Sequence, residues 1–404
     1  MRQNFATFPA NVSFLLIFTL LTRLTYFMAW PFLSIILTRT YQLSPLAIGS
    51  VMSCCALISV IPGIYGGSLS DRFGRKNLLI LGCLLAIIGY ASIALSKSVF
   101  FFALSLLLTG VSFSLIDASS RALMSDLLQD KKRRELALQI RYLMVNVAAV
   151  SGPLIGIVLG LNAQKSTFLF TAFSYVPFFL FVLLNIPTGK VQGNSNLKDQ
   201  TDTELNAWQV TRLILKDRIY IVTLISNILF FIIYAQMESV VPQYLIVLDN
   251  VQAVNLVTVM LVTNAITVLV SQLYLVPWQA SMSPDERIIT GSFILATSLL
   301  AFWLNETTSP LWWGGCTVFF SIAEAILLPN FSILLDRLAP ERYRGAYLGA
   351  STLVVFGLSL GPFIGSVLLE WQGKGMFVFM TLISLCFAAL MLINKKKIRH
   401  RLDE

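Results

Sequence analysis

The chain has 404 residues, of which 56% are hydrophobic and only 12% are charged, and its mean hydropathy is +0.78. Water-soluble domains carry about 25% charged residues, so this composition excludes a soluble globular protein. The single histidine, His400, lies near the C-terminus, which excludes a histidine-based catalytic site or proton relay inside the apolar stretches. The 5 cysteines lack the spacing of metal ligands, and we expect no metal site.

Apolar stretches of roughly twenty residues recur along the whole chain. Each is long enough to cross a hydrocarbon layer of about 30 Å at about 1.5 Å per residue. They predict an all-α membrane protein with twelve transmembrane helices. In chain order the predicted spans are 13–37, 46–66, 77–95, 99–121, 140–161, 166–186, 219–246, 253–276, 288–304, 310–335, 346–369 and 375–394.

The longest polar stretch, residues 187–218, separates the sixth span from the seventh. Its composition is typical of a loop, and we interpret it as a cytoplasmic linker. The sequence therefore predicts an N-terminal six-helix bundle over 1–186, a C-terminal six-helix bundle over 219–394 and a basic cytoplasmic tail over 395–404.

Basic residues are distributed unevenly between the two sets of short loops. Because cytoplasmic loops carry the excess of Lys and Arg, the bias predicts that both termini are cytoplasmic. The net charge of +9 is then explained by orientation in a lipid bilayer, and we expect no nucleic-acid partner. The cytoplasmic set contains Arg72, Arg75, Lys76, Lys131, Lys132, Arg133, Arg134, Arg212, Lys216, Arg218, Arg342 and Arg344, against Arg39, Lys97, Lys165 and Lys374 on the opposite side.

The two halves of the chain contain an internal repeat. Residues 151–159 in the fifth span match residues 360–368 in the eleventh, at a constant offset of 209 (360 − 151). The first and seventh spans carry Pro31 and Pro242 in nearly the same place. A repeat of six helices plus six is expected of a transporter that moves two bundles around a site at the membrane midplane. The repeated Gly-Pro motifs are Gly152, Pro153 and Gly156, and Gly361, Pro362 and Gly365.

The loop after the second span carries a specific motif, G-x-L-x-D-R-x-G-R-K, over residues 67–76. Its defining residues resemble the signature loop of the major facilitator superfamily. The resemblance covers essentially the whole chain and is closest to bacterial drug/proton antiporter-like exporters. It implies a central cavity lined by helices 1, 4, 7 and 10, a monomer, and a cytoplasmic gate made by Gly67, Asp71, Arg72, Gly74, Arg75 and Lys76.

The resemblance also implies how that gate works. Asp71 would meet the positive N-terminal end of the eleventh span, with Arg75 nearby, and hold the cytoplasmic side shut. The Gly-Pro motif of the fifth span resembles the antiporter motif of drug exporters, but Ile157 stands where a further glycine is expected. Leu106 stands where many drug antiporters carry an arginine, so proton coupling through that arginine does not carry over.

Four ionisable residues lie deep in the apolar spans, where a charge costs about 2.5–3.5 kcal/mol and normally faces a cavity. We expect one cation facing two or three carboxylates around the cavity, with Arg141 only at the cytoplasmic start of the fifth span. Three alternatives stay open: Asp117 forms a local ion pair with Arg121, Arg23 is a structural partner of one carboxylate, or Glu324 hydrogen-bonds to neighbouring helices without titrating. The four residues are Arg23, Asp117, Glu238 and Glu324, in spans 1, 4, 7 and 10.

Glu238 is the preferred proton carrier, because Tyr234 and Gln236 flank it and Pro242 follows, where a local break would free backbone groups. Glu324 is the alternative carrier. Tyr26 and Tyr234 have hydroxyls that need partners when buried, and Asn146 is a polar group at membrane depth. These three complete the predicted cavity residues.

The leading functional hypothesis is proton-coupled efflux of a small organic compound of drug, peptide or siderophore type. A symporter that imports a nutrient is the second hypothesis, because the same fold and loop serve both directions. A membrane enzyme or lipid-handling protein is disfavoured, since the sequence shows no clustered catalytic set. No nucleotide-binding motif is present, so we expect no ATP and no cofactor, with the proton gradient of the bacterial inner membrane as energy source.

Overall fold

The computed structural model describes residues 8–128, 130–186, 207–279 and 282–403. Within these ranges the side chains of residues 63–71, 131–132, 135, 207–211, 272–273, 276–279, 342, 345 and 403 are not described. All regular structure in the described residues is helical, which confirms the all-α prediction.

The described helices account for the twelve predicted spans. Eleven helical stretches are long and apolar enough to cross a membrane. The last of them, Ala346–Leu402, has 57 residues, which at 1.5 Å per residue is about 85 Å, more than twice a bilayer of about 30 Å. It contains two helices, α16 (Val354–Gln372) and α17 (Met376–Asp403), joined by the short turn η4 (Gly373–Gly375).

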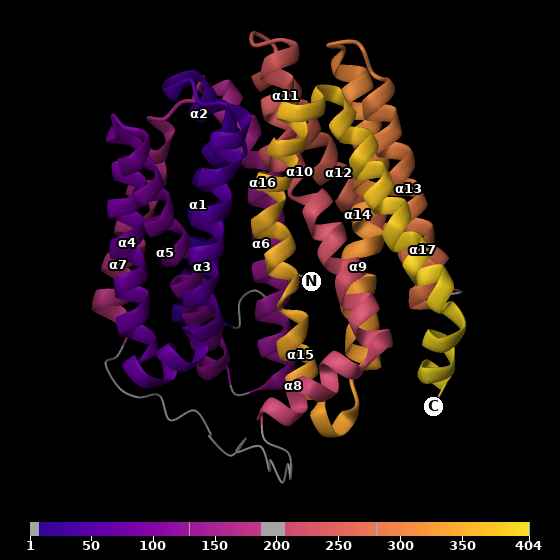
Figure 1. Cartoon of the computed structure of the whole chain (residues 1–404). Coiled ribbons are helices and arrows are strands. Elements are labelled where there is room, and N and C mark those ends of the chain that lie inside the picture. The colour runs from indigo at the N-terminus through magenta and orange to yellow at the C-terminus, as the bar shows by residue number, and fades with distance from the viewer. Residues whose placement is uncertain (1–7, 129, 187–206, 280–281, 404) are drawn as a thin grey trace. The chain divides into compact units, whose positions relative to one another are not determined.

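The chain divides into two compact units, and the first combines Met1–Gln42 with Cys54–Gln200. Within it α1 packs against α6 and α7, and α4 packs against α5 and α7. Its helices are drawn from indigo to magenta in Figure 1. They are α1 (Ala10–Ala29), η2 (Trp30–Phe32), α2 (Leu33–Tyr41), the greater part of α3 (Pro45–Phe73), α4 (Arg75–Leu95), α5 (Val99–Leu127), α6 (Lys131–Val158) and α7 (Thr167–Asn185).

The second unit combines Thr201–Glu404 with the short segment Leu43–Ser53 at the start of α3. That segment is held on α16, because Phe363 N donates to Ser53 Oγ at 2.9 Å and Leu46 N donates to Glu370 Oε2 at 3.0 Å. Helix α9 packs against α16 and α17, and α14 packs against α12 and α13. The remaining elements are α8 (Ala207–Lys216), α9 (Arg218–Tyr234), α10 (Gln236–Ser239), α11 (Val241–Leu248), α12 (Ala253–Gln279), α13 (Pro284–Leu304), α14 (Pro310–Leu338), η3 (Glu341–Tyr343) and α15 (Arg344–Ser351).

Several helices extend beyond the apolar stretch that predicted them. α5 continues to Leu127 rather than stopping at 121, and α6 begins at Lys131 rather than at 140. Hydropathy marks the part of a helix that fits the hydrocarbon layer, whereas charged residues such as Lys and Glu are good helix formers and let it continue into water. Residues 187–206 of the predicted linker lie outside the described residues, 207–216 form α8, and 395–403 of the predicted tail continue α17.

Helical breaks occur at equivalent places in the two units. Around Pro31 the first span is interrupted by η2, and around Pro242 the seventh span is split into α9, α10 and α11. Proline lacks the backbone N–H of the helical ladder, so its surroundings tolerate a break. The paired breaks agree with the repeat read from the sequence.

The first glycine of each Gly-Pro motif packs against an equivalent helix in the two units. A Cβ added at Gly152 would lie 2.8 Å from the carbonyl oxygen of Leu24 on α1. A Cβ added at its twin, Gly361, would lie 3.1 Å from that of Ile232 on α9. Leu24 and Ile232 are themselves 208 positions apart (232 − 24), close to the offset of the repeat. Both glycines therefore allow one helix of the unit to approach another closely.

Candidate functional site

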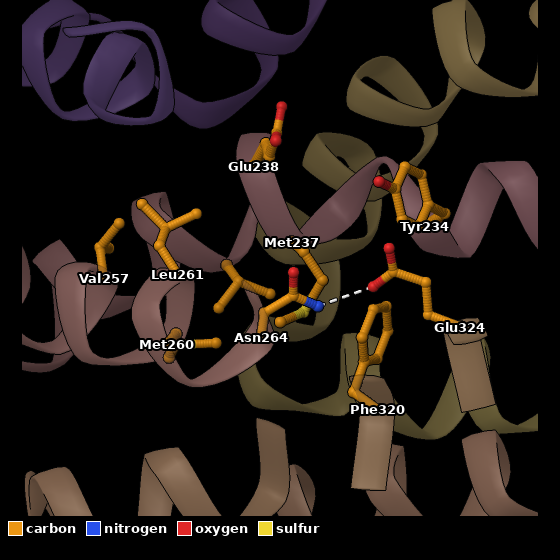
Figure 2. A pocket seen from close by; sticks show the side chains of 10 residues that line it. Tyr234, Met237, Glu238, Val257, Met260, Leu261, Asn264, Phe320 and Glu324 are labelled. Carbon is orange, nitrogen blue, oxygen red and sulfur yellow. Dashed lines mark hydrogen bonds between the residues drawn. The ribbon is translucent and has the colours of Figure 1, made fainter. Parts of the chain in front are cut away.

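Each unit contains a small polar cavity among its apolar helices. The cavity of the second unit is drawn in Figure 2. It brings together two of the four predicted deep ionisable residues, together with apolar and sulfur-containing side chains. Its lining residues are Tyr234, Met237, Glu238, Val241, Val257, Met260, Leu261, Asn264, Phe320 and Glu324.

Glu324 is the most enclosed acid of this cavity, with 8% of the residue exposed. It lies midway along α14, so its carboxylate is far from either helix end. Asn264 Nδ2 donates to Glu324 Oε2 at 2.7 Å (Figure 2). The same nitrogen lies 3.0 Å from Ser321 Oγ. Hydrogen bonds to a charged acceptor contribute about 1.5–3 kcal/mol, so Asn264 fixes the orientation of this carboxylate.

Asn264 was missed by the reasoning from sequence. It is an uncharged amide in the middle of α12, a helix that carries no ionisable residue near it. The signal that could have found it is its isolation, since a lone amide within an apolar span needs a hydrogen-bond partner from another helix.

Glu238 lies in a different local structure. It belongs to α10, a four-residue helix between the breaks at Ala235 and Val240. Among the described residues, no hydrogen bond or ion pair reaches its carboxylate, and in Figure 2 this group points away from the pair of Asn264 and Glu324. The cavity of the second unit thus contains one carboxylate oriented by a hydrogen bond, Glu324, and one without such a bond among the described residues, Glu238.

The residues predicted to flank Glu238 separate into two groups. Tyr234 lines the cavity and lies beside Glu324 in Figure 2. Gln236 instead packs against α16, where its Nε2 donates to Gly361 O at 2.9 Å. Its amide therefore links the broken seventh span to the Gly-Pro motif and is not part of the cavity.

The cavity of the first unit has the opposite charge balance. The expectation of one cation facing two or three carboxylates concerned four spans of the whole chain and stays a prediction. Within the first unit a single carboxylate, Asp117, contacts three arginines. Arg121 Nη2 lies 2.7 Å from Asp117 Oδ2, Arg23 Nη2 lies 4.0 Å from Oδ1, and Arg141 Nη2 donates to Oδ1. The ion pair between Asp117 and Arg121 that the sequence left open is therefore present, within a larger cluster.

Arg141 lies slightly further into the apolar span than expected. The sequence began the fifth span at 140, whereas the apolar part of α6 is Leu136–Val158, which places Arg141 five residues into it (141 − 136). At 1.5 Å per residue this is about 7 Å. Arg141 faces the same cavity as Arg23 and Asp117, which is lined by Thr19, Thr22, Arg23, Phe113, Ile116, Asp117, Ser120, Arg141, Tyr175 and Phe178.

Two further predicted residues lie outside both cavity linings. Tyr26 stacks on Trp30, with ring centroids 5.0 Å apart, and the Arg23 guanidinium lies 5.7 Å from its ring centroid. Asn146 Nδ2 donates to the Tyr142 carbonyl of its own helix at 3.0 Å. Tyr26 is thus next to the arginine cluster, whereas Asn146 satisfies its amide locally.

A family model described as the Major Facilitator Superfamily matches residues 15–359. The chain belongs to the Major Facilitator Superfamily. It is 27% identical over 405 residues to the MFS-type transporter YqjV of Bacillus subtilis, with 96% of each chain covered. It is 25% identical over 379 residues to a Na(+), Li(+), K(+)/H(+) antiporter of Planococcus maritimus, with 87% of each covered. Multidrug resistance protein MdtH of Photorhabdus laumondii is 23% identical over 358 residues, covering 87% of this chain and 84% of that protein.

Solved structures share the superfamily fold at low identity. The peptide transporter POT superposes with a TM-score of 0.80 at 15% identity, covering 97% of this chain and 96% of that one. A D-xylose-proton symporter gives a TM-score of 0.71 at 16% identity, covering 95% and 97%. The superfamily member described here is accordingly a multi-pass transporter of the bacterial inner membrane with a small-molecule substrate, and it is not an enzyme.

The superfamily signature loop is only partly described. The side chains of Gly67 and Asp71 lie outside the described residues. Gly74 separates α3 from α4 with a φ of 87°, a backbone conformation that favours glycine. Arg75 Nε donates to Asp126 Oδ2 on α5 at 3.0 Å, whereas Arg72 is exposed beside Phe73 and Lys76 is half-buried. Arg75 thus ties α4 to the C-terminal end of α5 inside the first unit of this superfamily member.

A second polar cluster ties together helix ends of the other unit. Arg401 Nη1 donates to Asp217 Oδ1 at 2.7 Å, and the Tyr347 hydroxyl donates to Asp217 Oδ2 at 3.0 Å. Burial of the Asp217 carboxyl opposes its ionisation, but the hydrogen bonds from Arg401, the Tyr220 amide and Tyr347 outweigh it. They hold the pKa of Asp217 below its usual value. The carboxylate therefore stays charged and joins α9, α15 and α17.

Proposed function

We propose that the protein is a proton-coupled exporter of a small organic compound, working by alternating access as a monomer with both termini cytoplasmic. The observation that carries this proposal is the pair of carboxylates, Glu238 and Glu324, in the cavity of the second unit. Ionisable groups deep in membrane helices are rare and mark substrate or proton pathways. No ATP and no cofactor take part, and the proton gradient supplies the energy.

The chemistry of the cavity supports competition between protons and substrate. A buried ionised carboxylate needs a neutralising partner, which can be a proton or a charged group of a substrate. Glu238 has no hydrogen-bond partner among the described residues, so it can exchange such partners without breaking an existing contact. We assign proton exchange to Glu238 and a supporting role to Glu324, which Asn264 holds in place.

The direction of transport rests on relatives rather than on geometry. The multidrug resistance protein MdtH and the Na(+), Li(+), K(+)/H(+) antiporter are both similar to this chain over most of its length. Multidrug resistance in the first relative and antiport against H(+) in the second favour efflux coupled to proton entry. Import of a nutrient by symport is the second candidate, because the D-xylose-proton symporter has the same fold.

The motion that this function requires would be a rocking of residues 1–186 against 219–394, with 187–218 as the linker. Arg23, Asp117, Tyr26, Tyr234 and Asn146 remain the further cavity candidates. The gate residues Gly67, Asp71, Arg72, Gly74, Arg75 and Lys76 would hold the cytoplasmic side closed in the outward-facing state.

The test compares compound profiles of cells that lack the protein with those of cells that overproduce it. Efflux predicts that a compound accumulates in the deletion strain and leaves overproducing cells, and that Glu238→Gln abolishes this difference. Glu306→Gln is the matched control, because that glutamate lies outside both cavities with 86% of its side chain exposed. Faster entry of the compound in the presence of the protein would replace efflux by symport. If Glu238→Gln transports normally and Glu324→Gln does not transport, the role of proton carrier belongs to Glu324.

A further inference from the structure

The cavity of the first unit contains more positive charge than its own acids neutralise. Asp117 is the one carboxylate among its described lining residues, and three arginines contact it. Two of these arginines, Arg23 and Arg141, line the cavity with only 16% and 14% of their side chains exposed. An ion cluster whose role was purely structural would be expected to balance its charges, and this one does not.

Donor groups in this cavity are left without acceptors. Arg141 Nε is buried and has no hydrogen-bond partner among the described residues. Arg23 approaches Asp117 only to 4.0 Å, which is too long for a hydrogen bond. A buried donor without a partner costs about 1–3 kcal/mol, and more when the group is charged. The Nε atom of Arg141 and the guanidinium of Arg23 thus lack a hydrogen-bond acceptor among the described residues.

The position of the Arg23 side chain is fixed by aromatic contacts. Its Cζ atom lies 4.1 Å from the ring centroid of Phe113 and 5.7 Å from that of Tyr26. Stacking on an aromatic face holds a guanidinium in place while leaving its edge free to donate. The edge of a guanidinium matches the two oxygens of a carboxylate or phosphate group.

We propose that this cavity binds an anionic oxygen group, a carboxylate or phosphate, of the transported solute. Arg23 and Arg141 donate to the anion, and Asp117 holds Arg141 in position while limiting the excess of positive charge. The solute is accordingly an organic anion or a zwitterion rather than a simple cation. The substrate class rests on the proposed transport of a small organic compound, whereas binding of the anion can be tested without transport.

The test uses purified protein in neutral detergent and four probes of similar size: benzoate, phenyl phosphate, benzylamine and benzyl alcohol. We expect the two anions to raise the thermal unfolding temperature, and the amine and the alcohol to leave it unchanged. Arg23→Gln and Arg141→Gln should each weaken benzoate binding by about 10- to 100-fold, the loss of one or two charge-assisted hydrogen bonds. The control is Arg337→Gln, an exposed arginine at the end of α14, which should bind benzoate like the wild type.

Further variants keep the result interpretable. Arg141→Lys preserves the charge but not the planar fork, so it should fold even if Arg141→Gln does not and should still weaken benzoate binding several-fold. Stabilisation by benzylamine instead of benzoate, or equal benzoate binding in the wild type and all cavity variants, would overturn the proposal. Arginine-dependent stabilisation by phosphatidylglycerol alone would assign the site to a lipid headgroup and overturn the role in substrate binding.

The two proposals fail separately. Glu238→Gln and Glu324→Gln lie in the other unit and should leave benzoate affinity unchanged. If those variants abolish transport but benzoate never binds, the anion site is wrong and the proton-coupled exporter stands. If benzoate binding depends on Arg23 and Arg141 but transport is independent of the proton gradient, the proposed anion site is correct and the proposed proton-coupled export is wrong.

Discussion

The cavities of the two units differ in the sign of their charge although their helices follow the same repeat. In the first unit, three arginines surround Asp117. In the second unit, Glu238 and Glu324 share a cavity that has no basic residue among its described lining. The paired helix breaks and the glycine contacts of α6 and α16 are nevertheless equivalent. The repeat therefore preserves the scaffold, while the charge placed on it has diverged.

The largest predicted effect is on the free energy of unfolding when one acid in each cavity is replaced by its amide. Asp117→Asn should lower the free energy of unfolding by about 3–5 kcal/mol, because it leaves buried arginines without their counter-charge. Glu324→Gln keeps the volume and an acceptor for Asn264, and should change stability by less than about 1 kcal/mol. Thermal unfolding in detergent measures both, and benzoate should recover part of the loss in Asp117→Asn. Equal losses in the two variants would contradict the difference in charge balance.

A smaller effect tests what the units share. Gly152→Ala and Gly361→Ala should each destabilise by about 1–3 kcal/mol, because overpacking a close contact forces the backbone apart. The added Cβ at Gly361 would lie 2.5 Å from Ala235 Cβ. Gly315→Ala on α14 is the control, since nothing lies within 4 Å of its added Cβ and helix propensity favours alanine there. Similar decreases in the free energy of unfolding for Gly152→Ala and Gly361→Ala would support equivalent packing in the two units. A decrease for only one of them would contradict it.

Removal of the amide that fixes Glu324 should have a moderate effect on transport and little effect on the first unit. Asn264→Ala deletes the 2.7 Å hydrogen bond to Glu324. We expect the transport rate to fall roughly tenfold, equivalent to about 1.4 kcal/mol, while benzoate affinity stays constant. Transport assays in proteoliposomes measure the first quantity. An unchanged rate would show that Glu324 needs no positioning.

The smallest effect concerns pH and the cluster around Asp217 in the second unit. Because the pKa of Asp217 is lowered in the folded protein, its contribution to stability is present above the pKa of the unfolded state and is lost as the pH falls through the folded value. Stability should therefore be constant from neutral pH to about pH 5 and fall below about pH 4, the usual aspartate value. Asp217→Asn should flatten part of this acid dependence in thermal unfolding. An identical acid profile in the variant would assign the loss to other carboxylates.

Local sequence signals predicted much of the fold. Apolar stretches defined the twelve spans, the repeat paired Pro31 with Pro242, where a local break was expected, and the motif at 67–76 indicated the superfamily. Helix ends were predicted less well. Hydropathy marks where a helix leaves the hydrocarbon layer, whereas the hydrogen-bonded backbone of α5 and α6 continues beyond that point.

The sequence predicted which residues belong to the candidate site but not which of them contact one another. Arg23, Asp117, Glu238 and Glu324 stood out because charge is rare in apolar spans. Which of them meet depends on the rotation and packing of different helices, and no spacing within one helix encodes that. Asn264 went unnoticed for the same reason, since its importance comes from Glu324, 60 positions further along the chain.

The length of α17 has a practical consequence for anyone altering the C-terminus. Its 28 residues span about 42 Å at 1.5 Å per residue, which exceeds the hydrocarbon core of a bilayer, about 30 Å thick. The last turns of α17 carry Arg399, which pairs with Glu286 on α13, and Arg401, which pairs with Asp217. Truncation after Asn394 would remove both ion pairs. A purification tag should therefore be attached after residue 404, so that α17 keeps its full length.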